Sequence, residues 1–176
     1  MLITLFALAL QSAAPAPAPD PRASFFAAAR EGRADLVAAL LDAGAPVDAR
    51  DDRGYTALTL AAYNGRTDLV ALLIARGADA CAMDPRGNTA LMGAAFKGDD
   101  AMARLLLDKA PCPVDQTNAQ GQTALMMASL FGRETQVRML VAKGAATGLK
   151  DASGNTALSL AERQGATGVV AALGGR

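Results

Sequence analysis

The chain has 176 residues, of which 52% are hydrophobic and only 4% aromatic, and its 17 basic residues are balanced by 17 acidic residues. A formal net charge of zero argues against nucleic acid as the partner, because a nucleic-acid-binding surface needs a surplus of basic charge. The sequence has no histidine and only two cysteines, so it lacks the commonest general base and the commonest metal ligand, and we expect no catalytic residue, no cofactor and no metal site.

The N-terminal segment predicts export. Residues 2–10 are apolar apart from one threonine, and alternating prolines and alanines follow. This stretch is too short to span a bilayer, which needs about 20 residues, but it matches the h-region of a secretory signal, and Ser12-x-Ala14 supplies small residues for cleavage. We expect a signal peptide at residues 1–14, a Pro/Ala-rich linker at 15–21, and a periplasmic or secreted protein without stable membrane insertion after cleavage. The alternative is an uncleaved apolar segment with a polyproline tether, in a cytoplasmic protein.

A repeated tripeptide organises the rest of the chain. Thr-Ala-Leu recurs 33, 34 and 33 residues apart, beginning at Thr56, Thr89, Thr123 and Thr156. A period near 33 residues is typical of a stacked repeat array rather than a single globule. Each copy follows a turn, and the turn-opening residues are Asp51, Asp84, Asn118 and Asp151. A turn role explains the three aspartates among them better than acid–base catalysis does.

Residues 52–84 show the plan of one unit. Leu58, Ala61 and Ala62 have the i, i+3, i+4 spacing of one helix face, and the threonine before them is a helix cap whose loss costs about 1 kcal/mol. A second apolar stripe lies within residues 69–73, and a glycine follows it, where a left-handed backbone can end a helix. The unit is therefore predicted as turn, helix, loop, helix and extended finger.

These motifs resemble the ankyrin repeat. The family carries Thr-Pro-Leu-His at the start of its first helix, and here the proline is alanine in each copy. The segment Leu69-Val70-x-Leu72-Leu73, followed by Gly77-Ala78, also matches the family pattern. The resemblance covers residues 22–176 and implies an all-α ankyrin-repeat solenoid of five helix-loop-helix units with short β-hairpin-like fingers. The units span residues 22–51, 52–84, 85–118, 119–151 and 152–176.

The first and last units are atypical, as the ends of an array must be. A single unit cannot bury its apolar faces alone, so stability comes from contacts between neighbouring units. The first unit has charged residues among its alanines, which suits an N-terminal cap. The last unit ends in a short, glycine-weakened helix at residues 168–173, and we expect this helix to fray.

The resemblance implies that partners bind the concave face, formed by the fingertips and the exposed side of the first helices. The residues that vary between units on this face include an aromatic centre with a charged rim, which is the composition of an interaction hot spot. The candidate partner-binding residues are Arg53, Tyr55, Tyr63, Arg86, Asn88, Phe96, Lys97, Gln122, Leu130 and Phe131. The alternative is that the rings only cover the seam between helices. Met92, Met126 and Met127 are predicted to fill the core.

These features predict a non-catalytic protein–protein interaction module, a monomer that binds a protein partner on its concave face. Two other hypotheses stay open at this point. One is an accessory or protective factor for an exported enzyme, and the other is a secreted effector or inhibitor.

The third unit is irregular. Its second helix ends at Ala110 where other units have glycine, and Pro111-Cys112-Pro113 follows with one inserted residue, which predicts a bulged or longer finger. Equivalent points on adjacent fingers lie roughly 9–10 Å apart, whereas a disulfide needs Cα atoms within about 7 Å. We therefore expect Cys81 and Cys112 to be two partly buried thiols. A bridge is the alternative, if the insertion narrows the gap and the compartment is oxidising.

Overall fold

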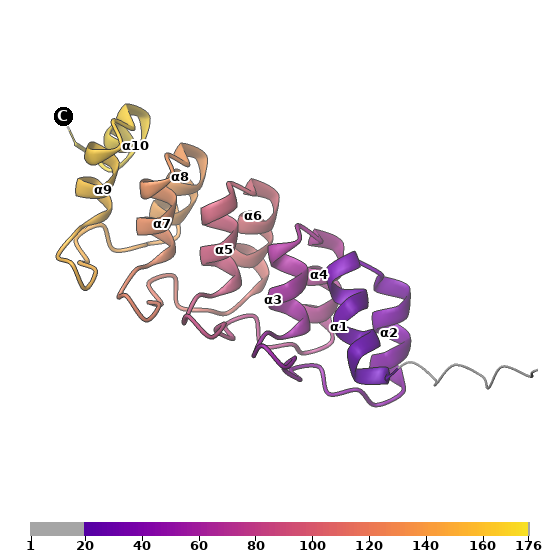
Figure 1. Ribbon diagram of the computed structural model, residues 1–176. Coiled ribbons are helices and arrows are strands. Elements are labelled where there is room, and N and C mark those ends of the chain that lie inside the picture. Colours follow the sequence, from indigo (N-terminus) through magenta and orange to yellow (C-terminus); the bar gives the residue numbers. More distant parts are fainter. Residues whose placement is uncertain (1–19, 176) are drawn as a thin grey trace, which may run out of the picture.

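A computed structural model describes residues 20–175 of the chain. The predicted signal peptide at residues 1–14 and most of the predicted linker lie outside the described residues. Ten α-helices in five pairs follow one another along the described chain, as the all-α prediction requires (Figure 1). The pairs are α1 Pro21–Glu31 with α2 Ala34–Asp42, α3 Ala57–Tyr63 with α4 Thr67–Ala75, α5 Ala90–Lys97 with α6 Asp100–Lys109, α7 Ala124–Leu130 with α8 Glu134–Ala142, and α9 Ala157–Arg163 with α10 Thr167–Ala172.

The helices form two layers. The first helices of the pairs contact one another in the order α1, α3, α5, α7 and α9, and the second helices do the same from α2 to α10 (Figure 1). Buried alanines at Ala61, Ala94 and Ala128 lie in the layer of first helices. Because alanine adds little width to a helix, it allows neighbouring first helices to approach closely, and each unit buries its apolar face against the next.

The first helix begins at Pro21, so the last residue of the predicted linker belongs to the helix instead. Proline suits the first turn of a helix because its missing N–H would have no partner there. The Asp20 side chain accepts a hydrogen bond from the backbone N–H of Arg22 at 2.9 Å. Phe25 and Phe26 are buried, and Phe25 stands where the other units have the leucine of Thr-Ala-Leu.

The threonine of each Thr-Ala-Leu caps the helix that follows, as predicted. The Oγ1 atoms of Thr56, Thr89, Thr123 and Thr156 accept from the backbone N–H three residues later at 3.2, 3.3, 3.2 and 3.2 Å. In the second and fifth units that position holds Thr59 or Ser159, whose hydroxyl oxygen accepts a hydrogen bond from the backbone N–H of the capping threonine. In the third and fourth units that position holds Met92 or Met126, and both methionines are buried in the core instead.

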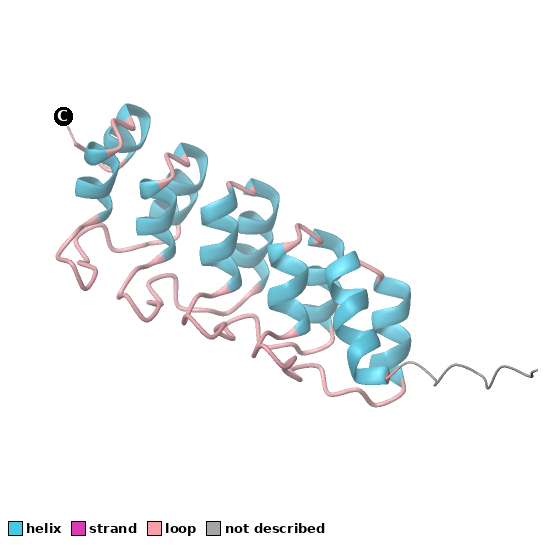
Figure 2. Cartoon of the chain, viewed as in Figure 1, coloured by secondary structure: helices cyan, strands magenta, loops and turns pink. Residues whose placement is uncertain are grey.

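The fingers extend from one edge of the stack as loops, and residues 20–175 contain no regular strand (Figure 2). Each finger closes by a backbone hydrogen bond across its turn, such as Asp84 N–H to the Asn88 carbonyl at 2.8 Å. One isolated antiparallel bridge, between Arg50 and Thr56, is the most regular pairing in the described fingers. The fingers are therefore hairpin turns without a sheet.

Gln136 on α8 is a polar side chain buried between the third and fourth units. Its Nε2 donates to the Ala94 carbonyl at 3.3 Å, but its Oε1 has no partner among the described residues. The Ala94 carbonyl already accepts from the backbone of Gly98 and Asp99.

Replacing Gln136 by methionine is expected to leave the free energy of unfolding unchanged or to raise it by about 1 kcal/mol. The change removes the buried Oε1 acceptor, which has no partner in the described part of the chain, and it also removes the long hydrogen bond from Nε2 to the Ala94 carbonyl. Methionine has a side chain of similar volume, so no cavity is left. Urea denaturation measures the difference. Gln136→Ala is the control, and it is expected to destabilise by about 2 kcal/mol because it leaves a cavity. A loss of more than about 1 kcal/mol in Gln136→Met would show that the hydrogen bond to Ala94 outweighs the buried acceptor.

The last helix, α10, has one buried residue, Val169, and no side-chain cap at its start. We expect its amide hydrogens to exchange with solvent much faster than those of α5, because few apolar contacts oppose local opening. Hydrogen exchange followed by mass spectrometry compares the two helices in one experiment. Equal protection of α10 and α5 would contradict the expected fraying.

Candidate functional site

A groove lies on the concave face at the seam between the second and third units. It encloses about 490 Å³, and its lining comes from two fingers, the last residue of α3, four residues of α5 and one residue of α7. The lining residues are Tyr55, Tyr63, Asp84, Arg86, Asn88, Met92, Gly93, Phe96, Lys97 and Met127. Six of the ten candidate partner-binding residues therefore share one groove.

The remaining four candidates lie outside that lining. Arg53 places its guanidinium 5.4 Å from the centre of the Tyr55 ring, at the neighbouring fingertip. Phe131 stands next to the groove because its ring packs against Phe96. Leu130 is half-buried against the C-terminal core. The Gln122 amide oxygen accepts from Asn118 Nδ2 within its own finger.

Tyr63 spans the seam between the second and third units. Its hydroxyl donates to Asp84 Oδ2 at 2.9 Å, and its backbone carbonyl accepts from Lys97 Nζ at 2.7 Å. Its ring lies so close to α5 that a Cβ atom on Gly93 would be 2.1 Å from Tyr63 Cε1. Burial of the ring, and then the bond to Asp84, raise the pKa of Tyr63 far above its ordinary value. Tyr63 is therefore a wall of the groove that also holds two units together, and its truncation is expected to reduce stability as well as binding.

Asp84 is the one carboxylate in the groove lining, and it is almost completely buried. Its Oδ1 accepts from the backbone N–H groups of Arg86 and Asn88, both at 2.8 Å. Asp51, Asn118 and Asp151 make the same pair of bonds in their own fingers. The predicted turn role of these residues is confirmed. Because the second oxygen of Asp84 accepts from Tyr63, the carboxylate is committed to holding the finger in place.

Phe96 and Phe131 form the most exposed aromatic pair of the described chain. Their ring centroids are 4.7 Å apart with an interplanar angle of 78°, an edge-to-face arrangement. The side chains are 51% and 39% exposed, respectively. The pair bridges the ends of α5 and α7, so one rim of the groove is apolar and accessible.

Gly93, Met92, Asp84 and Met127 line the groove but were not among the sequence-predicted partner-binding residues. Met126 is a core residue as predicted, whereas half-exposed Met127 contributes to the concave surface. One sequence feature could have indicated this groove. Gly93 occupies a position at which the second, fourth and fifth units have Leu60, Met127 and Leu160. The missing side chain makes room for a ring from the preceding unit.

Cys81 and Cys112 form a disulfide, and their Cα atoms are 5.4 Å apart. The expectation of two separate thiols is therefore wrong. The spacing of equivalent points on adjacent fingers overestimated the Cα–Cα distance between the two cysteines. The segment around Pro111 and Pro113 brings Cys112 closer to the preceding finger. The Gln116 side chain adds a hydrogen bond from Nε2 to the Cys81 carbonyl at 3.2 Å.

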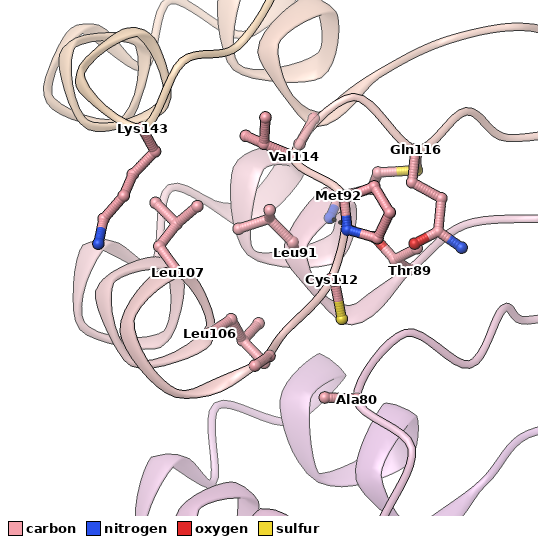
Figure 3. A pocket seen from close by; sticks show the side chains of 13 residues that line it. Ala80, Thr89, Leu91, Met92, Leu106, Leu107, Cys112, Val114, Gln116 and Lys143 are labelled. Carbon is pink, nitrogen blue, oxygen red and sulfur yellow. Dashed lines mark hydrogen bonds between the residues drawn. The ribbon is translucent and has the colours of Figure 1, made fainter.

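A second, smaller cavity of about 180 Å³ is lined in part by Cys112 (Figure 3). Leu91, Leu106, Leu107 and Val114 contribute apolar walls, and the Gln116 and Lys143 side chains lie at its edges (Figure 3). Lys143 Nζ pairs with Asp108 Oδ1 at 2.8 Å. A mostly apolar cavity with its cation already paired offers a ligand few directional contacts, so the concave groove is the stronger candidate site.

No described helix has the length and hydropathy needed to cross a membrane. Within residues 20–175, no three His, Cys, Asp or Glu side chains are grouped so that they could hold a metal ion.

The comparison with known families agrees with the architecture. A profile described as ankyrin repeats, three copies, matches the chain twice, over residues 25–118 and over residues 110–174. No curated protein matches the sequence. Members of the matched family are generally protein-binding modules and typically non-catalytic. The described chain has five stacked helix pairs, and a threonine caps the first helix of each of the last four. The two profile matches together span nearly all the described residues. The chain therefore belongs to the ankyrin-repeat family.

Proposed function

We propose that the protein is a non-catalytic interaction module that binds a segment of another protein on its concave face. The observation that carries the proposal is the exposed pair of Phe96 and Phe131 at the rim of the groove. Burying two such rings against a partner removes apolar surface from water at a gain of roughly 25 cal/mol per Å². Aromatic residues in the centre of a patch dominate the energetics of many interfaces.

Other residues of the groove have supporting roles in the proposal. Phe96 and Phe131 anchor the partner, and Arg53 and Arg86 orient it. Tyr63 shapes the wall and keeps the second and third units in register through Asp84.

The test is a binding comparison with matched variants. The full chain, tagged in its own host, captures its partner, and the affinity of the purified pair is measured by calorimetry. Phe96→Ala combined with Phe131→Ala is expected to weaken binding by about 1–3 kcal/mol, or roughly 5- to 150-fold in Kd. Thermal unfolding should change little, since both rings are substantially exposed.

Val141→Ala is the control, because Val141 is 37% exposed but lies on α8 in the second layer of helices. It should leave the affinity unchanged. If the double phenylalanine variant kept full affinity for the same partner, the concave groove would not be the binding surface.

We further infer that the protein works in an oxidising compartment, the periplasm or the cell exterior. The Cys81–Cys112 bridge supports this inference, because stable disulfides are rare in the cytosol. In such a compartment the module would serve as an accessory or protective factor for an exported enzyme, or as a secreted effector or inhibitor. Cell fractionation combined with trapping of free thiols by alkylation tests the location. Recovery of the protein in the cytosol with both cysteines alkylated would contradict it.

A further inference from the structure

We propose that the segment bound in the concave groove is acidic, with carboxylates next to an aromatic or large aliphatic side chain. The inference rests on the proposed function and adds the chemistry of the partner. It follows from an imbalance of charge in and beside the groove.

Three cations lie in or beside the groove, against a single carboxylate in its lining, that of Asp84. Arg86 and Lys97 line it, and Arg53 lies at the neighbouring fingertip. Among the six salt bridges of the described residues, none involves Arg53, Arg86 or Lys97. The carboxylate of Asp84 accepts hydrogen bonds on both oxygens. Lys97 Nζ donates to the Tyr63 carbonyl at 2.7 Å, but this neutral oxygen leaves the ammonium charge in place, so a partner's carboxylates would meet three cations that form no salt bridge with a described residue.

Other arginines of the array are used to join neighbouring units. Arg30 pairs with Asp51, and the side chains of Arg66 and Arg133 donate to the carbonyls of Arg30 and Phe96. By contrast, the guanidiniums of Arg53 and Arg86 donate no hydrogen bond to any described residue. A guanidinium can bind a carboxylate through two parallel hydrogen bonds, so these two positions are suited to acidic side chains.

The positions of Arg53 and Arg86 predict the spacing of carboxylates along the bound segment. Arg53 and Arg86 are each the third residue of a turn in consecutive fingers, where the next two fingers have Gln120 and Ser153. Packed helices are about 8–10 Å apart, and an extended chain advances about 3.3 Å per residue. Because successive side chains of an extended chain point to opposite faces, a segment laid across the fingertips would meet these arginines with carboxylates two or four residues apart, and a nearby apolar side chain would reach Phe96.

The same charges could attract an anionic polymer such as single-stranded DNA, but the surface favours a peptide. Nucleic-acid grooves track many phosphates with many cations and offer flat aromatic faces for stacking. Here three cations are clustered in a chain of zero net charge, and the exposed rings meet edge to face. A short acidic segment matches that small charge better.

The experiment selects binders from a display library of random 12-residue peptides with the full chain as bait. Wild-type protein is expected to enrich peptides with Asp or Glu two or four residues apart beside an aromatic or large aliphatic residue. Their affinity should fall about tenfold or more in the variant that combines Arg86→Glu and Lys97→Glu, because the cations would become repulsive. The variant combining Arg104→Glu and Lys109→Glu is the control, since it reverses two exposed cations of α6 outside the groove.

The outcomes separate the two proposals. Peptides that need Phe96 and Phe131 but show no enrichment of acidic residues, and that tolerate charge reversal in the groove, would overturn the acidic partner and leave the proposed function intact. Selection that yields no peptide dependent on Phe96 and Phe131 would count against both. Tighter binding of oligo(dT) than of any selected peptide, lost on charge reversal in the groove, would overturn the peptide in favour of an anionic polymer. Circular dichroism and thermal unfolding of each variant confirm that it is folded.

Discussion

Replacing Cys81 and Cys112 together by alanine is expected to lower the free energy of unfolding by about 3–4 kcal/mol. The bridge joins residues separated by 31 positions, and the chain-entropy relation for a loop of that length predicts about 3.7 kcal/mol. The bridge also joins the fingers of the second and third units, and the stability of a repeat array depends on such nearest-neighbour contacts. Losing it should therefore weaken the interface at which the groove is built.

Urea denaturation of the oxidised protein, the reduced protein and the double alanine variant measures this effect. Reduced wild type and the double variant should unfold at similar urea concentrations, well below the oxidised protein. The single variant Cys81→Ala is the control, since it removes the bridge and leaves Cys112 in place. If reduction left the urea midpoint unchanged, the bridge would have no role in holding the two units together.

Replacing Gly93 by alanine is expected to destabilise the protein by about 1–3 kcal/mol, although alanine normally favours a helix by about 1 kcal/mol over glycine. The new Cβ would lie 2.1 Å from Tyr63 Cε1 and 2.5 Å from Tyr63 Cδ1. Because real carbon contacts are not that short, the ring must leave its place. The hydrogen bond from Tyr63 to Asp84 would then be lost, together with the burial of the ring.

A double-mutant cycle isolates the steric cause. In a Tyr63→Ala background, Gly93→Ala should stabilise the protein by up to about 1 kcal/mol, because only the gain in helix propensity remains. Gly148→Ala is the control, since a Cβ there would meet nothing within 4 Å. Equal effects of Gly93→Ala with and without the tyrosine would show that the ring does not occupy this space.

The sequence was sufficient for the features that depend on residues close together in the chain. A threonine at the start of the first helix in each of the last four units bonds to an N–H three residues on, and the finger turns close through residues two and four positions away. These bonds use short-range geometry that repeats every 33 or 34 residues, so the unit plan and the order of elements follow from the pattern alone. The family match over residues 25–118 and 110–174 agrees with that prediction.

The sequence did not reveal contacts between units, because they depend on how one unit is rotated and offset against the next. Tyr63 was predicted as a partner-binding residue, yet its ring also lies over Gly93 of the following unit and its hydroxyl is bonded to Asp84. Cys81 and Cys112 were expected to stay apart, yet the insertion brings them into a bridge. Leu130 and Gln122 were also predicted to bind a partner. Leu130 instead packs against the C-terminal core, and Gln122 accepts a hydrogen bond from Asn118 in its own finger.

The amino-acid sequence by itself determined the repeat, the caps and the turns, and it supplied a list of candidate residues for a binding surface. Only the tertiary structure decided which of those residues meet in one groove, which of them hold the units together, and which cations of the groove form no salt bridge within the described residues. The physical reason is one of range. Helices and turns are specified by hydrogen bonds spanning three or four residues, whereas the groove is made by side chains about 33 residues apart whose meeting depends on close packing between stacked units.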